Sequence, residues 1–254
     1  KSNIIRKKGG GTPIKKMRHF ISNEDLVNSL VGRCLLPREF KEQFLKVDRV
    51  KYLQDKTRKY IDSPSKIYSG QTISAPHIHA FALKELQPVL KKGAHVLDVG
   101  CGSGFLTAVF AYIVGVDKGM GKVVGIDIYQ ELVDFSKKNI LENNPELSKD
   151  TVQRKLKDNL IIIEGNGWEG YPKYKQKLYD AIHVGAEATE LPKKLWAQLK
   201  PGGIMVIPIK KKNESTKMMI YQKPVFKNSL CNGMPCNVKE SIGVRFVPLV
   251  ENLK

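Results

Sequence analysis

The chain has 254 residues, 41% of them hydrophobic, so it can bury one sizeable core and fits one α/β domain better than two. Its formal net charge is +18 at pH 7, which would attract polyanions such as nucleic acid or an anionic membrane. No run approaches the roughly 18 apolar residues of a membrane span, and the cysteines lack the paired spacing with histidine that a zinc site needs.

The positive charge is concentrated at the start of the chain. Residues 1–22 contain seven lysines and arginines and no acidic residue. We expect this segment to be a flexible arm, with a functional basic arm or the remnant of a targeting segment as alternatives. No signal segment with a charged start and an apolar run opens the chain, and we expect a cytoplasmic protein without a membrane span that acts as a monomer.

Helical patterns dominate residues 23–92. Apolar residues recur at helix-like intervals between residues 23 and 62. Farther on, Ser74 followed by Ala75 and Pro76 predicts a helix start, with Ser74 as the N-cap and proline in the first turn. Gly93 is expected to end that helix.

Strand-like apolar runs alternate with helical patterns over residues 93–209, which predicts a mostly parallel sheet with helices on both faces. The runs are residues 95–99, 123–128, 160–163, 181–184 and 204–209. Residues 210–254 contain further strand candidates at 218–221 and 244–249 with no long helix between them, and we expect these to add antiparallel strands. The whole of 23–254 is then a single domain.

The strongest local signal is a strand that runs into a glycine-rich turn and then into a helix at residues 105–114. Glycine lets a ligand approach the backbone closely at the end of the strand. The spacing is G-x-G-x-G and departs from the G-x-G-x-x-G of dinucleotide sites. Asp98 precedes the glycines and is interpreted as part of the site, with a turn-capping carboxylate as the alternative. The turn is Gly100-Cys101-Gly102-Ser103-Gly104.

Two further strand ends carry ligand-binding signals. The second strand ends at Asp127, whose carboxylate can accept hydrogen bonds from both hydroxyls of a ribose, a feature shared with nicotinamide enzymes. The third ends in Gly165-Asn166-Gly167, small and polar residues that suit the edge of an adenine ring. An Asn-Gly turn without a ligand is the alternative interpretation of this third segment.

Three segments taken together resemble the protein-L-isoaspartate O-methyltransferase family. They are Thr-Ile-Ser-Ala-Pro-His at 72–77, Asp-Ala-Ile-His-Val-Gly-Ala at 180–186, and Arg-Phe-Val-Pro-Leu at 245–249. The match covers roughly residues 26–249, nearly all of the chain outside the basic arm.

The resemblance implies a Rossmann-like methyltransferase fold that uses S-adenosyl-L-methionine and releases S-adenosyl-L-homocysteine. The substrates would be damaged proteins and peptides, whose L-isoaspartyl carboxylate is methylated so that a succinimide forms and repair to L-aspartate begins. Carried over by position, Ser74 would be the catalytic residue, with substrate contacts at Thr72, Ile73, His77 and Val247. Residues 23–92 would then hold the substrate part and residues 93–209 the cofactor-binding core. The expected cofactor contacts are Asp98, Gly100, Cys101, Gly102, Ser103, Gly104, Asp127, Ile128, Glu131, Gly165, Asn166 and Gly167.

Two positions depart from the family pattern. The family commonly has Gly-Asp-Gly where this chain has Asn166, so an adenine amino group would meet a neutral amide oxygen in place of a carboxylate. Tyr68 stands where many relatives have glycine. Both departures bear on how ligands are held.

Three alternatives use the same pattern differently. An RNA methyltransferase would explain the basic surface, but the fourth strand lacks an Asn/Asp-Pro-Pro-aromatic motif and a nucleophilic cysteine motif. A second alternative is a protein that keeps the cofactor-binding fold but has lost catalysis. Asn166 in place of the usual acid is the only feature that supports it. A nicotinamide oxidoreductase is disfavoured by the glycine spacing and by the missing Tyr-x-x-x-Lys pair. A metal site is not expected.

Overall fold

The computed structural model describes residues 19–150, 152–153, 155–171, 178–225, 230–231, 234–235 and 238–250. Residues 1–18 of the predicted arm lie outside this part. The last residues of that segment contact the rest of the molecule: His19 forms a β-bridge with Ile61, and the Phe20 N–H donates to the Tyr60 carbonyl over 3.0 Å. Ser22 accepts a hydrogen bond from Asp25 N–H and so caps the first helix.

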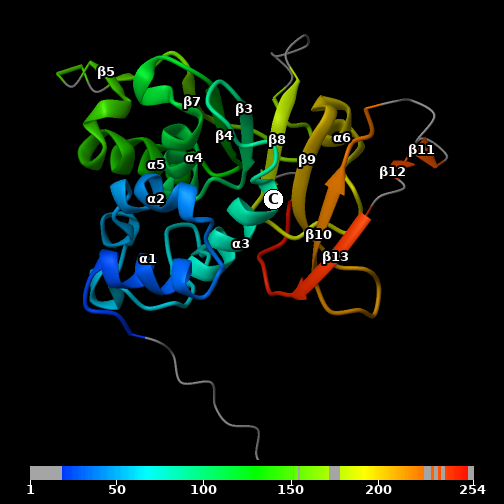
Figure 1. Cartoon of the computed structure of the whole chain (residues 1–254), viewed down its shortest axis with the longest axis horizontal. Helices are drawn as coiled ribbons and strands as arrows, with labels where there is room; N and C mark the ends of the chain where they lie inside the picture. Colours follow the sequence, from blue (N-terminus) through cyan, green and yellow to red (C-terminus); the bar gives the residue numbers. More distant parts are fainter. Residues whose placement is uncertain are drawn as a thin grey trace, which may run out of the picture.

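Within the described residues, a seven-stranded sheet has the order β13-β10-β9-β8-β3-β4-β7 (Figure 1). The five strands from β9 to β7 are parallel, and β10 and β13 complete the sheet in antiparallel pairing. The predicted fold class is thereby confirmed. The bounds are β3 His95–Val99, β4 Lys122–Asp127, β7 Leu160–Glu164, β8 Tyr179–Val184, β9 Leu199–Ile209, β10 Lys217–Gln222 and β13 Val238–Gly243.

Helices cover both faces of this sheet. The larger core lies against α1 to α5, and the smaller core lies against α6. Figure 1 shows the N-terminal helices below α4 and α5, away from β10 and β13. The α-helices are α1 Asn23–Gly32, α2 Lys41–Lys46, α3 Pro76–Leu86, α4 Phe105–Val114, α5 Gln130–Asn143 and α6 Lys193–Gln198.

Short elements connect these parts. The 3₁₀ helices are η1 Arg38–Phe40, η2 Arg49–Tyr52, η3 Lys56–Arg58, η4 Val116–Lys118 and η5 Pro145–Leu147. The short strand pairs are β1 Ser65–Lys66 with β2 Thr72–Ile73, β5 Ser148–Asp150 with β6 Lys155–Leu156, and β11 Leu230–Cys231 with β12 Met234–Pro235.

Alternating side chains of the parallel strands enter different cores. In β3, Val96 lies in the larger core and Leu97 in the smaller one, and both are fully buried. A strand covered on both faces needs an almost unbroken apolar run, which is the pattern that the sequence shows here. The chain runs from β3 to β4 and β7 on one side and returns through β8 on the other. A ligand site is therefore expected at the carboxyl ends of β3 and its neighbours.

Three boundary predictions were wrong. Ala75 is the N-cap of α3, one residue after the predicted Ser74, and it offers no side-chain cap. This helix ends at Leu86, well before Gly93, because Pro88 follows and lacks the N–H that would continue the helix. Residues 244–249 form no strand; Pro248 makes a single bridge with Glu187, and the edge strand is β13.

Asn144 connects the N-terminal helical part of the chain to α4. Its side chain is buried and accepts a hydrogen bond from the Tyr52 hydroxyl. It also donates to the Lys46 carbonyl over 3.0 Å and to the Tyr112 hydroxyl over 3.1 Å. One amide thus joins polar groups from α2, η2 and α4, and it is the hydrogen-bond partner of the buried Tyr52 hydroxyl.

We expect Asn144→Ala to lower the free energy of unfolding by about 2 to 4 kcal/mol, because it leaves several buried polar groups unsatisfied. Asn143→Ala is the matched control, since that neighbouring side chain donates to Asn139 O in the same helix and should cost less than about 1 kcal/mol. Urea denaturation of both variants measures the difference. Equal losses would show that the buried network contributes nothing of its own.

Candidate functional site

The glycine turn is held against the end of β4 by its own backbone. The N–H groups of Gly100 and Cys101 both donate to the Ile126 carbonyl, over 2.8 and 3.0 Å. Gly100, Gly102 and Gly104 all have positive φ, at 75°, 55° and 81°. Only glycine adopts this series of conformations without strain, so the turn needs glycine at each of these positions.

The Asp127 carboxylate completes this turn from the end of β4. It accepts the Gly102 N–H over 2.9 Å and the Tyr129 N–H over 3.2 Å. Burial raises the pKa of Asp127, although backbone hydrogen bonds from Gly102, Tyr129 and Ile128 act in the opposite direction. A carboxylate offers about four acceptor positions, so this side chain can hold the turn and still receive two ligand hydroxyls.

A cavity of about 210 Å³ opens directly beside Asp127. It lies at the carboxyl ends of β3, β4, β7 and β8, where the topology places a ligand site. Its walls combine glycine backbone, one carboxylate and apolar side chains. The lining residues include Gly100, Gly102, Asp127, Ile128, Gly165, Gly167, Ile67, Gln71, Thr72, Tyr129, Leu132, Gly185, Val247 and Leu249.

The predicted cofactor residues divide into three groups around this cavity. Six of them line it: Gly100, Gly102, Asp127, Ile128, Gly165 and Gly167. Asp98, Cys101 and Ser103 instead line a neighbouring cavity of about 30 Å³. Gly104, Glu131 and Asn166 line neither. The roles of all twelve stay predictions.

Those last three residues have other contacts. A Cβ on Gly104 would lie 2.3 Å from Ser136 Oγ, so this glycine allows the turn to pack closely on α5. Glu131 is exposed, and its carboxylate accepts the Ser69 hydroxyl over 2.6 Å. Asn166 Oδ1 accepts the Trp168 N–H over 2.8 Å and so shapes the turn after β7.

Several lining residues were not predicted from the sequence. Gln71 lies in the loop between β1 and β2, close to the segment that carries the family resemblance. Leu132 lies on α5, and Leu249 belongs to the resembling segment near the end of the chain. Apolar residues at such places look like ordinary core residues in the sequence, and only the fold shows that they face the cavity.

Asp98 and His183 form a buried pair that lines the small cavity. His183 Nδ1 lies 2.7 Å from one Asp98 carboxylate oxygen, and the Thr107 hydroxyl donates to the other over 2.6 Å. All three side chains are buried. Asp98 is therefore held between β8 and α4, and His183 is part of this hydrogen-bonded wall, in keeping with its position at a strand end.

A separate cleft of about 450 Å³ holds most of the predicted substrate residues. Thr72, Ser74, His77 and Val247 line it, while Ile73 lines the small cavity. Thr72 and Val247 also line the cofactor cavity, so the two spaces share walls. The Val247 carbonyl already accepts the Glu187 N–H over 2.7 Å, and within the described residues its own N–H makes no hydrogen bond.

The loop between β1 and β2 closes one side of the cofactor cavity. Tyr68 packs edge-on against Phe135 of α5, with 4.9 Å between the ring centroids. The adjacent Ser69 has a positive φ of 55° and donates to Glu131, also on α5. The departure at Tyr68 therefore adds an aromatic contact that glycine could not make.

Comparison with known proteins relates this geometry to one family. The family described as Protein-L-isoaspartate(D-aspartate) O-methyltransferase (PCMT) matches residues 21–254. Protein-L-isoaspartate O-methyltransferase 1 of Arabidopsis thaliana is 41% identical over 80% of this chain and 80% of its own. The enzyme of that name from Pyrococcus abyssi is 34% identical over 93% of this chain and 94% of its own.

A solved structure agrees with the sequence relatives. It is a Plasmodium falciparum chain described as a protein-L-isoaspartate O-methyltransferase in complex with S-adenosyl-L-homocysteine. Its TM-score is 0.78 at 36% identity, over 91% of this chain and 99% of that one.

The chain belongs to the protein-L-isoaspartate(D-aspartate) O-methyltransferase family.

Membership confirms the resemblance seen in the sequence, and with it the enzyme class and the cofactor expected for that class. The residues present fit an adenosyl group. Asp127 offers a carboxylate beside glycine backbone, and a Cβ on Gly167 would lie 2.6 Å from Val99 Cγ1, so this position accommodates only glycine. Leu132 and Leu249 give apolar walls for a flat ring.

Two features of other site classes are missing from the described part of the chain. Residues 19–250, apart from the gaps given above, contain no group of three His, Cys, Asp or Glu side chains arranged to hold a metal ion. No described helix is long and apolar enough to cross a membrane.

Gly104→Ala should lower the free energy of unfolding by more than about 1 to 2 kcal/mol, because a left-handed φ already costs an L-residue that much and the new methyl group meets Ser136. Gly32→Ala is the control. Gly32 lies in α1, and nothing lies within 4 Å of the position that its Cβ would take, so alanine there should be neutral or slightly stabilising. Thermal denaturation compares them, and a harmless Gly104→Ala would refute the packing argument.

Proposed function

We propose that this chain transfers a methyl group from S-adenosyl-L-methionine to the free carboxylate of L-isoaspartyl residues in damaged proteins and peptides. The observation that carries the proposal is that a cavity and a cleft adjoin and share wall residues. The cavity beside Asp127 and the cleft beside Ser74 share Thr72, Gly185 and Val247 as walls. A donor in the cavity and a peptide in the cleft would therefore meet at one place.

The chemistry needs little from the protein beyond positioning. A carboxylate with an ordinary pKa of about 4 is ionised at neutral pH, so no enzyme base is required. The bound cofactor supplies a methyl group activated on a sulfonium. The walls of the two spaces orient the carboxylate and exclude water from it, which strengthens the nucleophile by removing its hydration.

Ser74 is the proposed catalytic residue. It is half-buried and lines both the small cavity and the cleft. Its hydroxyl can donate a hydrogen bond to the substrate carboxylate and hold one oxygen in place. The amides at this helix start are occupied: His77 N–H donates to Asp62, and Ile78 N–H donates to Ala75 O. The Ser74 hydroxyl is the side-chain donor that we assign to the substrate carboxylate.

The rest of the repair follows from the product. A methyl ester carries a better leaving group than a carboxylate does: the neighbouring backbone amide nitrogen attacks the ester carbonyl, methanol leaves, and a succinimide closes without help from the enzyme. Hydrolysis of that ring returns some normal aspartate. The proposal includes a single domain over residues 23–254, a monomeric state and a cytoplasmic location.

Transfer of labelled methyl from S-adenosyl-L-methionine to a peptide with one L-isoaspartyl residue tests the function. The normal aspartyl peptide and an RNA transcript serve as controls. Base-labile label on the isoaspartyl peptide alone is the expected result. Label on the RNA, or cofactor binding with no labelled product, would refute the proposal.

Asp127→Ala should weaken cofactor binding by about 2 to 4 kcal/mol, because two hydrogen bonds to a charged acceptor are lost. The wild-type affinity should fall as the pH is lowered through the raised pKa of Asp127, since the protonated carboxyl accepts poorly, and it should level off above that pKa. Asp127→Asn should abolish this pH dependence. Calorimetry measures both effects, with the exposed Asp134→Asn on α5 as control. Unchanged affinity in Asp127→Ala would remove this residue from the site.

Ser74→Ala should lower kcat/KM for the isoaspartyl peptide by about tenfold or more, since a hydrogen bond to a charged group is lost, while the affinity for the cofactor stays the same. Ser148→Ala, on the distant β5–β6 hairpin, is the matched control. Steady-state kinetics with both peptide and cofactor varied decides the outcome. Equal turnover by the two variants would remove Ser74 from carboxylate binding.

A further inference from the structure

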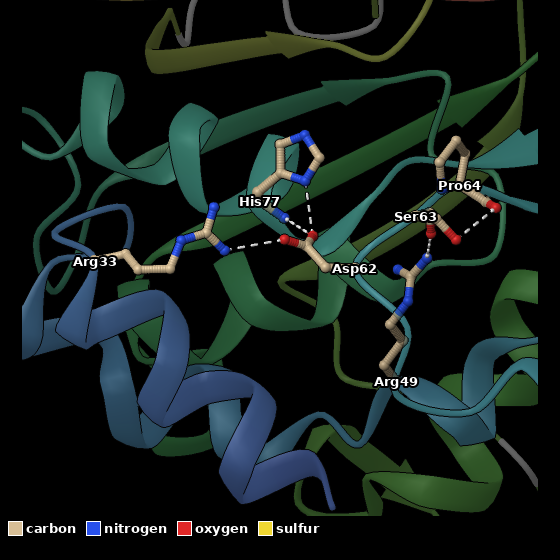
Figure 2. Close-up of polar contacts among 6 residues, drawn as sticks. All are labelled: Arg33, Arg49, Asp62, Ser63, Pro64 and His77. Carbon is tan, nitrogen blue, oxygen red and sulfur yellow. Dashed lines mark hydrogen bonds and ion pairs between the residues drawn. The ribbon is translucent and has the colours of Figure 1, made fainter. Parts of the chain in front are cut away.

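Asp62 is a nearly buried carboxylate that joins three elements next to the substrate cleft. One oxygen accepts the His77 backbone N–H over 2.9 Å and lies 2.7 Å from His77 Nδ1. The other accepts Arg33 Nη1 over 3.2 Å. Figure 2 shows Asp62 between these two side chains, with the second nitrogen of the His77 ring on the side away from Asp62. The side chain of Asp62 is 7% exposed.

These contacts keep Asp62 ionised. Burial alone would raise its pKa, but hydrogen bonds from the side chain and backbone of His77, together with the one from Arg33, lower it below its usual value. An ionised carboxylate can only accept hydrogen bonds. Nδ1 of His77 must therefore carry the proton in this contact, which fixes both the orientation of the ring and its tautomer.

The same carboxylate replaces the missing cap of α3. Ala75 occupies the N-cap position and has no side chain that could bind the first amides. Asp62 binds the His77 amide from a segment 15 residues earlier. His77 is consequently fixed through its backbone and through its ring by a single partner.

His77 presents the rest of its ring to the cleft. Its side chain is 39% exposed and lines the cleft together with Ser74 and Val247. Among the described residues, no hydrogen bond involves Nε2 of this ring. A peptide that occupies the cleft would meet this nitrogen.

We propose that Asp62 is a positioning residue for the methyl transfer: it holds His77 so that Nε2 binds the main chain of the peptide beside the isoaspartyl residue. The proposal rests on the function proposed above. Arg33 completes the arrangement from the C-terminal end of α1 by holding the second oxygen of Asp62. Neither Asp62 nor Arg33 lines the cleft among its described residues; both act through His77.

Asp62 also has a structural role that the test must separate. Arg49 is fully buried and donates to the Ser63 carbonyl over 3.2 Å (Figure 2). Its burial lowers its pKa to about 9, and the nearby charge of Asp62 opposes that shift. Removing the charge of Asp62 therefore destabilises the buried Arg49 cation, whether or not a peptide is bound.

A double-mutant cycle distinguishes the two roles. The variants are Asp62→Asn, His77→Ala and the two combined, with Lys149→Ala in the exposed Lys149–Asp158 ion pair as control. We expect Asp62→Asn to raise the KM for the isoaspartyl peptide about tenfold, as the loss of a charge-assisted hydrogen bond would. In the His77→Ala background, Asp62→Asn should change KM no further. The affinity for S-adenosyl-L-homocysteine should be equal in all variants.

A purely structural role predicts a different result. If Asp62→Asn changes the peptide KM by the same factor with and without His77, or leaves it unchanged, the positioning role is refuted. If Asp62→Asn fails to fold, Arg33→Ala takes its place in the double-mutant cycle. Its effect on KM must likewise disappear in the His77→Ala background.

Nitrogen-15 spectra of labelled histidine keep this inference separate from the proposed function. His77→Ala assigns the resonances. The wild-type ring should carry its proton on Nδ1, and Asp62→Asn should shift the tautomer population toward Nε2. An unshifted population refutes the positioning of the ring, whereas failure of the wild-type chain to methylate the isoaspartyl peptide refutes the function itself.

Discussion

The hydrogen bonds between the glycine turn and the end of β4 are the constraint on which the site depends. They tie the Gly100 and Cys101 amides to Ile126 O and the Gly102 amide to Asp127. One carboxylate thereby shapes the turn and faces the cavity that the turn creates. Because Gly100, Gly102 and Gly104 have positive φ, side chains are disfavoured at these three positions, and the absence of one at Gly104 lets the turn pack against α5.

The extended segment around Thr72 is the second organising feature. Thr72 lines the cavity beside Asp127, the small cavity and the cleft beside Ser74, so its placement sets the boundary between the spaces in which we propose that the methyl donor and the peptide bind. Contacts to α5 hold the loop before it, through Tyr68 and Ser69. Asp62 holds the helix after it through His77. The reacting groups are therefore positioned by a short strand that is fixed at both ends.

Sequence patterns predicted an element correctly where a single local physical cause determines its structure. The five parallel strands could be predicted because burial on both faces requires apolar runs, and the glycine turn because its backbone permits nothing else. The cap of α3 could not, because the partner of its first amide is a carboxylate 15 residues away. Residues 244–249 alternate like a strand, yet they make a single bridge, to Glu187 in the segment that follows β8. Leu132 and Gln71 face the cavity only through tertiary packing.

The titratable groups around the reacting centre favour a substrate that arrives already ionised. Burial raises the pKa of the Cys101 thiol well above its ordinary value, so it stays protonated and is a poor nucleophile. Burial likewise lowers the pKa of His79, with a further contribution from the charge of Arg49, so its imidazole stays neutral. His183 is engaged by Asp98 through Nδ1. These three groups offer little help to a nucleophile that must lose a proton, whereas a carboxylate needs no base. For a carboxylate, a hydrogen-bond donor, which we propose to be the Ser74 hydroxyl, and a wall that excludes water are sufficient.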